Sequence, residues 1–103
     1  MKIIPEPIAF EWDKGNGEKN EKKHGISNKE IEQAFDNDPK IIFSDEAHSL
    51  RERRYGMYGS TNEKVLLSMV FTIRDEKVRV ISARRMSKKE RRAYEKIKKD
   101  TSF

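Results

Sequence analysis

The sequence predicts an α+β domain in which a mostly antiparallel sheet is flanked by helices, with the elements in the order β-α-α-β-β-β-β-α. Three observations support this class. A chain of 103 residues is long enough for one modest core and too short for two. Although 40% of the residues are charged, the apolar ones fall into periodic runs. Short turns join the last three strand candidates. We therefore expect one domain over residues 1–103, with flexible ends at 1–7 and 98–103.

The start of the chain is expected to hold a short strand and a helix. Residues 8–12 alternate weakly between apolar and polar side chains, which favours a strand. The helix is expected to begin after Gly17 and to end at His24. Gly25 would then take the left-handed conformation that commonly closes a helix.

The second helix has a clear start, because Ser27 with Glu30 three residues later forms a capping box. Asp38-Pro39 should end it, since proline disfavours helical geometry in the residue before it. Its buried stripe is expected to consist of Ile31, Ala34 and Phe35.

Three strands are expected in the middle of the chain, at residues 41–43, 54–58 and 65–73. The segment 59–62, Gly-Ser-Thr-Asn, is rich in turn-forming residues and should join the second of these strands to the third. The run 65–73 is almost continuously apolar, as expected for a central strand covered on both faces.

Residues 78–85 should form the last strand, after a turn at Asp75-Glu76. Strict alternation places one arginine at the end of each face, with Val78, Val80, Ser82 and Arg84 on one side and Arg79, Ile81, Ala83 and Arg85 on the other. A second capping box, Ser87 with Glu90, begins a basic terminal helix. The apolar face of that helix is limited to Ala93, Tyr94 and Ile97.

Positive charge is concentrated in the last third of the chain. The net charge is +5, but residues 74–103 carry twelve Lys or Arg against five Asp or Glu, whereas residues 1–73 carry eleven against thirteen. Guanidinium groups on a strand end beside a helix N-terminus attract phosphate by charge and by forked hydrogen bonds. A polyanion is therefore the first partner to consider, and a Lys-rich helix that only aids solubility is the alternative.

Composition excludes several kinds of site. The chain has no cysteine, which rules out disulfides, thiolate zinc sites and cysteine nucleophiles, and its two histidines argue against a histidine-based metal centre. We expect catalysis, if any, without a metal or cofactor. No apolar run approaches the roughly 20 residues of a membrane span or the length of a signal peptide, so we expect a cytoplasmic protein.

Short blocks over about residues 8–96 resemble the BrnT-type toxins in order and spacing. In chain order they are Phe10-Glu11-Trp12-Asp13, Asn20 to Ser27 with Lys23-His24-Gly25, Phe35 with Asp38, Asp45 with His48-Ser49, Glu52 with Arg54, and Arg79 to Arg84 through Glu90 and Tyr94. The stretch Arg51-Glu52-Arg53-Arg54 is more basic than is usual in that family, and Gly15 and Gly17 interrupt the N-terminal helix.

The resemblance implies the toxin half of a bacterial type II toxin-antitoxin pair. Such a toxin is a ribonuclease with a RelE-like fold that slows growth by cutting RNA and inhibiting translation. It also implies a BrnA-like ribbon-helix-helix antitoxin that neutralises the toxin. Promoter DNA would be reached only through that complex, which could contain a toxin homodimer.

Cutting RNA without a metal requires activation of the 2′-hydroxyl, neutralisation of the phosphorane charge and protonation of the leaving oxygen. The candidate catalytic residues are His48, Glu52, Arg54, Arg79 and Arg84. The arginines would hold phosphate, His48 would transfer a proton near neutral pH, and Glu52 would act as a base or, as we prefer, hold Arg54 in place. The alternatives are surface ion pairs for the arginines and a solvated loop position for His48.

The candidate RNA-binding residues are Lys23, Arg85, Lys88, Arg91, Arg92 and Tyr94. The basic members would attract phosphate without reading sequence, and Tyr94 would stack on a base or pack in the core. Trp12 is expected to be buried. The alternative function is a module that binds nucleic acid or antitoxin without catalysis.

Overall fold

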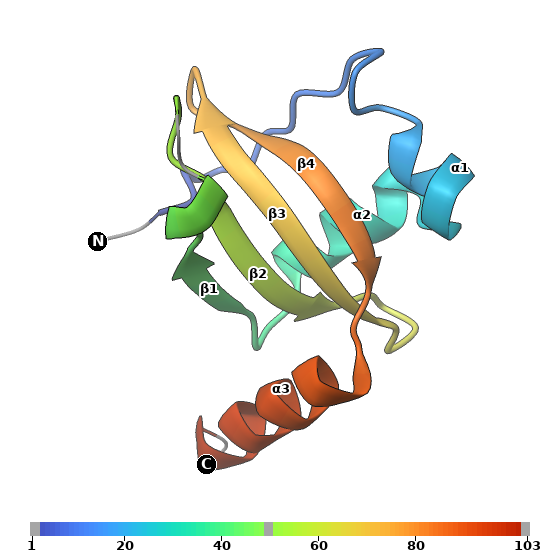
Figure 1. Cartoon of the computed structure of the whole chain (residues 1–103), viewed down its shortest axis with the longest axis vertical. Coiled ribbons are helices and arrows are strands. Elements are labelled where there is room, and N and C mark those ends of the chain that lie inside the picture. Colours follow the sequence, from blue (N-terminus) through green and yellow to red (C-terminus); the bar gives the residue numbers. More distant parts are fainter. Residues whose placement is uncertain (1–2, 49–50, 102–103) are drawn as a thin grey trace.

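The computed structural model describes residues 3–48 and 51–101, with the side chains of His48 and Thr101 excepted. Its elements are, in order, α1 (Lys19–His24), α2 (Asn28–Asp36), β1 (Ile41–Ser44), the 3-10 turn η1 (Glu46–His48), β2 (Tyr55–Ser60), β3 (Leu66–Arg74), β4 (Lys77–Arg85) and α3 (Lys88–Thr101). The four strands form one antiparallel sheet in the order β1-β2-β3-β4 (Figure 1). The α+β class is confirmed, and the likeness to RelE stays a prediction.

The strand predicted at residues 8–12 is reduced to a single parallel bridge between Phe10 and Val78. Further along β4, polar side chains occupy the outer edge instead of a second backbone. The Asn16 amide donates to the Val80 carbonyl at 3.1 Å, and the Asn20 side chain accepts from the Ala83 N–H at 3.0 Å. These side chains satisfy backbone hydrogen-bonding groups on the outer edge of β4. This explains why the segment at residues 8–12 does not extend its pairing along β4.

Both early helices form as their caps predict. Gly25 follows α1 with φ of 70°, and both hydrogen bonds of the Ser27–Glu30 capping box are present. α2 buries Ile31, Ala34 and Phe35, as expected. This helix covers one face of the sheet and lies behind the strands in Figure 1.

The core lies between α2 and the sheet. Phe35 is at its centre, with edge-to-face ring contacts to Phe10 at 5.3 Å and to Phe71 at 5.2 Å. Such pairs add to the hydrophobic burial of the rings themselves. Ile4 is also buried, and residues 98–101 continue α3. The flexibility expected for residues 1–7 and 98–103 stays a prediction.

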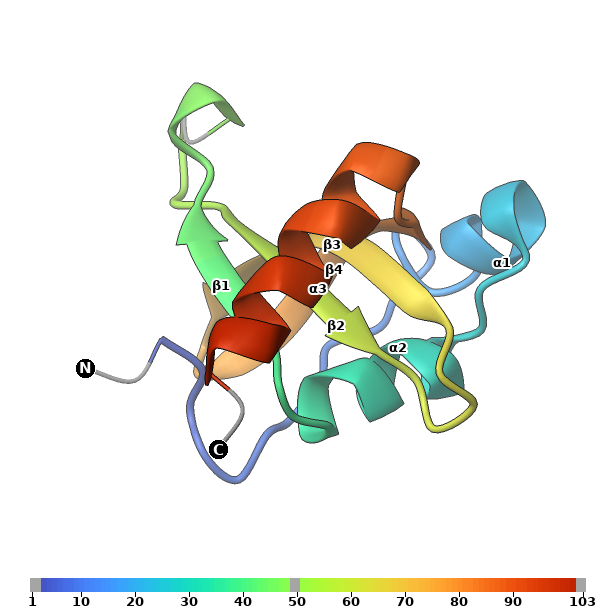
Figure 2. The same ribbon diagram turned by 90° about the horizontal axis from the view of Figure 1, so that it is seen from below.

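The opposite face of the sheet, here called the open face, has no helix across its centre and is turned to the viewer in Figure 1. The prediction that β3 is covered on both faces holds only in part, because Thr72 is the one residue of β3 that is buried on this face. Leu67, Met69 and Phe71 are buried toward α2, whereas Ser68 and Val70 on the open face are only partly buried. α3 crosses the ends of the strands, as the view from below shows (Figure 2).

A β-bulge changes which residues of β4 share a face. The register shifts so that Val70 pairs with Ser82 and Phe71 pairs with Val80, which leaves Ile81 as the extra residue. Strict alternation had placed Arg84 and Arg79 on opposite faces. The structure corrects this, because the bulge resets the alternation and brings both arginines to the open face.

Two further expectations needed adjustment. Gly59 and Ser60 belong to β2 rather than to the following turn, because Gly59 packs against α2, where a Cβ would come within 3.1 Å of the Ala34 carbonyl oxygen. In α3, Tyr94 is buried, but Ala93 is exposed and Ile97 is 42% exposed, so the predicted apolar face contains one core residue. The two-residue turn at Asp75-Glu76 is confirmed, and both residues have positive φ.

Candidate functional site

A row of polar side chains crosses the open face near α3. Tyr58, Ser68 and Arg84 occupy directly paired positions on β2, β3 and β4. Glu90, in the first turn of α3, lies against this row. Its carboxylate accepts two parallel bonds from Arg84, at 2.7 and 2.9 Å, and a third from the Ser68 hydroxyl at 3.2 Å. We call these four residues the Arg84 cluster.

The N-terminus of α3 fixes Glu90 from the other side. The Ser87 N–H donates to the Glu90 carboxylate at 2.8 Å, and the Glu90 N–H donates to the Ser87 hydroxyl at 3.2 Å, so the predicted capping box is present. The bond from Arg84 is the largest cause of a lowered pKa for Glu90, and with help from Ser87 it outweighs burial to give a value of about 2. Glu90 is therefore ionised at neutral pH and holds Arg84 by a charged fork.

Arg84 is nonetheless accessible. Its side chain is 48% exposed, while that of Glu90 is 18% exposed. Glu90 binds the Nη1 and Nη2 ends of the guanidinium, and Nη1 also donates to the Arg85 carbonyl at 3.2 Å. Among the described residues, none accepts from the Nε side of the group. That edge, made of Nε and Nη2, has the fork geometry that suits a phosphate.

Tyr58 places a phenol next to this pair. Burial is the main cause of a raised pKa for Tyr58, and the Glu90 charge adds to it, whereas Arg84 opposes it. The phenol is therefore protonated at neutral pH and can donate a hydrogen bond. Sequence reasoning missed both Tyr58 and Ser68, because only the pairing register aligns them with Arg84.

Arg79 lies further along β4 in a different setting. Its Nη1 donates to Glu11 at 2.9 Å and to Asp13 at 2.6 Å, and its Nη2 donates to Asp13 at 3.2 Å. Its side chain is 17% exposed. The bonds from Arg79 lower the pKa of Asp13. Arg79 thus fastens the N-terminal segment to β4, and two carboxylates neutralise its charge.

Arg74 and Glu52 extend this second group. We call the five residues together the Arg79 cluster: Glu11, Asp13, Glu52, Arg74 and Arg79. Two bonds of 3.1 and 3.2 Å join Arg74 to the Glu52 carboxylate, and Arg74 also lies 3.8 Å from Glu11. Glu52 therefore bonds to Arg74, and its expected role in holding Arg54 stays a prediction. Three carboxylates face two arginines in this cluster.

The remaining predicted residues are dispersed. Lys23 is exposed on α1, and Arg85 donates to the His24 carbonyl at 3.0 Å, which joins β4 to α1. The Arg54 carbonyl accepts from the Asp45 N–H at 2.9 Å just before β2. The side chain of His48 lies outside the described residues, so its role stays a prediction.

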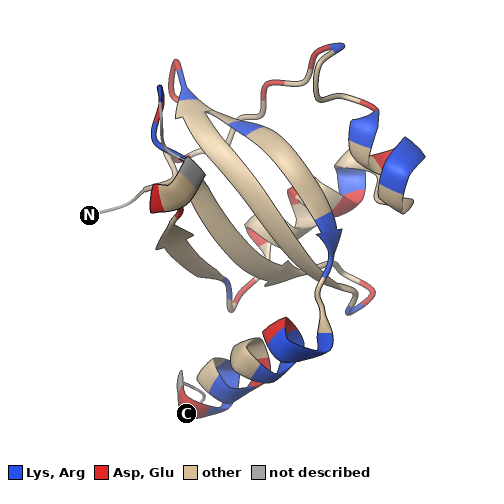
Figure 3. Ribbon diagram, in the orientation of Figure 1, with Lys and Arg blue, Asp and Glu red and all other residues tan. Residues whose placement is uncertain are grey.

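α3 carries the rest of the predicted RNA-binding set. Lys88, Arg91 and Arg92 are exposed and, with Glu95, line a shallow groove of about 400 Å³. Figure 3 shows that much of the α3 ribbon belongs to Lys and Arg. Tyr94 is 0% exposed, and its hydroxyl donates to the Pro39 carbonyl at 2.8 Å. Stacking of Tyr94 on a base is therefore incompatible with this structure, since its ring packs in the interior and its one polar group is already bonded.

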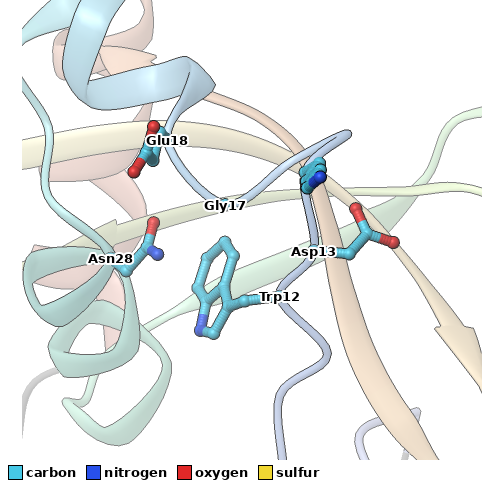
Figure 4. Close-up of a pocket in the computed structure, with 6 residues that line it drawn as sticks. Trp12, Asp13, Gly17, Glu18 and Asn28 are labelled. Carbon is cyan, nitrogen blue, oxygen red and sulfur yellow. The ribbon is translucent and has the colours of Figure 1, made fainter.

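A depression of about 530 Å³ adjoins the Arg79 cluster (Figure 4). Trp12, which was expected to be buried, is partly buried in its wall and packs against the core, and its indole N–H donates to Glu32 at 2.8 Å. The other residues that line it are Asp13, Lys14, Gly17, Glu18 and Asn28. Two carboxylates beside one lysine make this depression a poor place for a phosphate.

Neither a metal site nor a membrane-spanning helix is found among the described residues. Among the residues that the structure describes, no group of three or more His, Asp or Glu side chains is arranged to hold a metal ion. Within the same residues, none of the helices combines the length and the apolar character that crossing a bilayer requires.

Comparison with known proteins identifies a matching family. The family model described as "Ribonuclease toxin, BrnT, of type II toxin-antitoxin system" matches residues 12–90. No curated protein matches the chain significantly. The matched region includes the Arg84 cluster and all of the Arg79 cluster except Glu11, and it ends in the first turn of α3, at Glu90.

Proposed function

Because this chain belongs to the BrnT family of ribonuclease toxins of type II toxin-antitoxin systems, we propose that it cleaves cytoplasmic RNA without a metal ion. Cleavage would inhibit translation and growth until a ribbon-helix-helix antitoxin binds the toxin. The observation that supports a specific site is the Arg84 cluster, where an accessible arginine is held in a fork beside a protonated phenol.

Arg84 is the proposed phosphate-binding residue. A phosphate on its Nε and Nη2 edge would receive two parallel hydrogen bonds while Glu90 keeps the other end of the guanidinium in place. The same contact would stabilise the additional negative charge of the phosphorane. Lys88, Arg91 and Arg92 on α3 would attract the neighbouring phosphates of the chain.

Proton transfer is divided among other groups in this proposal. Glu90 is a weak base because its pKa is about 2, so its role is to orient Arg84. The Tyr58 phenol, whose pKa is raised, would donate to a phosphoryl oxygen or to the leaving oxygen. His48 is the proposed acceptor of the 2′-hydroxyl proton, since an imidazole titrates near neutrality.

The second candidate is a module that binds RNA without cutting it. The low pKa of Glu90 favours this candidate, because the one carboxylate bonded to Arg84 cannot act as an efficient base at neutral pH. Binding that weakens steeply with salt, with no cleavage product after long incubation, would identify it.

The test compares wild type, Arg84→Ala and Arg53→Ala in cleavage of total RNA, with and without a chelator, and in growth after induction. Arg53 is a matched control because it is an exposed arginine, 62% exposed, outside the proposed site. We expect Arg84→Ala to lose about 100-fold or more in cleavage rate and to relieve growth arrest. Arg53→Ala should cleave like wild type, and the chelator should have no effect.

Equal cleavage by wild type and a folded Arg84→Ala variant would contradict the proposed site. Loss of wild-type cleavage on chelation, with recovery on addition of a divalent ion, would contradict the metal-free mechanism.

A further inference from the structure

We propose that Phe43 and Tyr58 form a stacking subsite for one unpaired base of a single-stranded RNA whose phosphate binds Arg84. This inference rests on the proposed function and specifies how its substrate is held. It starts from an apolar ring on the open face that neither the core nor the Arg84 cluster uses.

Phe43 lies on β1, the edge strand of the sheet, and its side chain is 41% exposed. Phe43 and Ile97 are the two large apolar side chains that the described part of the chain leaves exposed. Burying such a ring would be favourable, and its exposed part at the strand edge is accessible to a ligand.

The neighbouring strand is shaped to hold this ring. Gly56 pairs with Phe43 across β1 and β2, and a Cβ on Gly56 would overlap carbons Cε2 and Cζ of the ring. Gly56 needs no left-handed conformation, because its φ is not positive. Its lack of a side chain is therefore explained by the ring that lies against its backbone.

Tyr58 connects the ring to the Arg84 cluster. The Phe43 and Tyr58 rings meet edge to face, with centroids 5.2 Å apart and planes at 67°. Tyr58 in turn stands in the paired row with Ser68 and Arg84. Since adjacent strands are about 4.8 Å apart, β2 and β4 are separated by about 10 Å, comparable with the extent of one nucleotide.

The chemistry of this surface favours RNA over an apolar protein segment. One end of the row is a half-exposed arginine, and the basic residues of α3 begin just beyond it. An aromatic ring beside a cationic groove is the usual means of holding single-stranded nucleic acid, because every base offers a stacking face. A paired base is already stacked, so the subsite should require single-stranded RNA.

The test measures binding of a short, uniformly 2′-O-methylated oligoribonucleotide, which cannot be cut, to the full chain. Phe43→Leu keeps an apolar side chain and removes the stacking face, and we expect it to weaken binding roughly 5- to 100-fold. Gly56→Ala should act in the same direction by displacing the ring. Phe43→Tyr, which keeps a ring, and Ile97→Ala, which truncates the other exposed apolar side chain, should bind like wild type.

An oligoribonucleotide that lacks its bases gives the matching control on the ligand. Wild type should bind this abasic oligonucleotide about as weakly as Phe43→Leu binds the oligonucleotide that has bases. Phe43→Leu and wild type should bind the abasic oligonucleotide equally. Thermal unfolding of each variant reports whether the domain is folded before binding is compared.

Three results would overturn the inference in distinguishable ways. If wild type binds and cleaves RNA but Phe43→Leu, Gly56→Ala and wild type bind the oligonucleotide equally, the subsite is wrong and the ribonuclease assignment stands. If wild type neither binds nor cleaves RNA, the proposed function fails and the subsite fails with it. Unchanged RNA binding with weakened antitoxin binding in Phe43→Leu would assign the ring to a protein interface.

Discussion

Arg79 and Arg84 lie on the same strand and the same face of the sheet, yet their guanidinium groups have different surroundings. Arg79 is 17% exposed and bonded to two carboxylates from the N-terminal segment. Arg84 is 48% exposed and bonded to the single carboxylate of Glu90. The first cluster holds three carboxylates against two arginines, whereas the second adjoins the basic end of β4 and the start of α3 (Figure 3).

This difference teaches that residue type and strand position do not by themselves make an arginine a phosphate site. A guanidinium that already neutralises two carboxylates has little charge to offer a third anion. A guanidinium group that is bonded to a carboxylate at one edge and accessible at the other is preorganised to bind a further anion. We therefore propose that the Arg79 cluster stabilises the fold and that the Arg84 cluster binds RNA.

The largest change in stability should come from Arg79→Ala. Losing three charged hydrogen bonds that tie the N-terminal segment to β4 should lower the free energy of unfolding by about 1–3 kcal/mol. Urea unfolding measures this loss. Cleavage by the folded fraction should stay near the wild-type rate, and a stable variant that has lost cleavage would place Arg79 in the chemistry.

Glu90→Gln should be less stable than wild type in a pH-dependent way. The folded-state pKa of Glu90, about 2, lies below its ordinary value of 4.5. The stabilisation that the ionised Glu90 carboxylate gives the folded state is therefore complete above about pH 4.5 and is lost as pH falls toward 2. At pH 7 we expect a deficit of about 1–2 kcal/mol, because water screens the half-exposed Arg84.

Unfolding of wild type and Glu90→Gln across this pH range checks the prediction. Glu95→Gln, on the exposed side of the same helix, is the matched control. A deficit for Glu90→Gln that stays constant down to pH 2 would mean that the Arg84 ion pair is not its source.

The basic side of α3 should affect binding and not the chemical step. Combined alanine substitution of Lys88, Arg91 and Arg92 should lower the slope of log affinity against log salt by about 0.7 for each RNA phosphate that these side chains neutralise in the wild type. Titrations of single-stranded RNA at several salt concentrations measure the slope. An unchanged slope would assign this surface to another partner, the antitoxin first.

The smallest effect is expected from Glu52→Gln. Glu52 and Arg74 are 36% and 45% exposed, and pairs of this kind contribute about 0–1 kcal/mol. Cleavage should be unchanged if Glu52 only pairs with Arg74. A loss of about 100-fold or more, measured on a single-stranded RNA, would instead make Glu52 a general base.

Local signals in the sequence predicted much of the fold. The capping boxes at Ser27 and Ser87 fixed the starts of α2 and α3, and Gly25 fixed the end of α1, because these signals act within one helical turn. The four strands of the sheet were also predicted, whereas the strand expected at residues 8–12 is a single bridge. Arg84 emerged as a site candidate because it ends a strand just before a basic helix.

Non-local features could not be predicted in this way. The bulge at Ile81 depends on how β3 and β4 fit together, and it decides that Arg79 and Arg84 share a face. The carboxylates that neutralise Arg79 belong to Glu11 and Asp13, which precede it by 68 and 66 residues in the chain. Tyr94 was a candidate for stacking because sequence alone does not reveal its bond to Pro39.

The most direct test of the central claim is a paired charge-conserving substitution, Arg84→Lys and Arg79→Lys, measured as single-turnover cleavage of the same RNA. Lysine keeps the charge but loses the fork. We expect a large loss of rate for Arg84→Lys and a rate near wild type for Arg79→Lys at temperatures where both are folded. The reverse pattern, or equal losses at both positions, would contradict the division of the open face into a structural end and an RNA end.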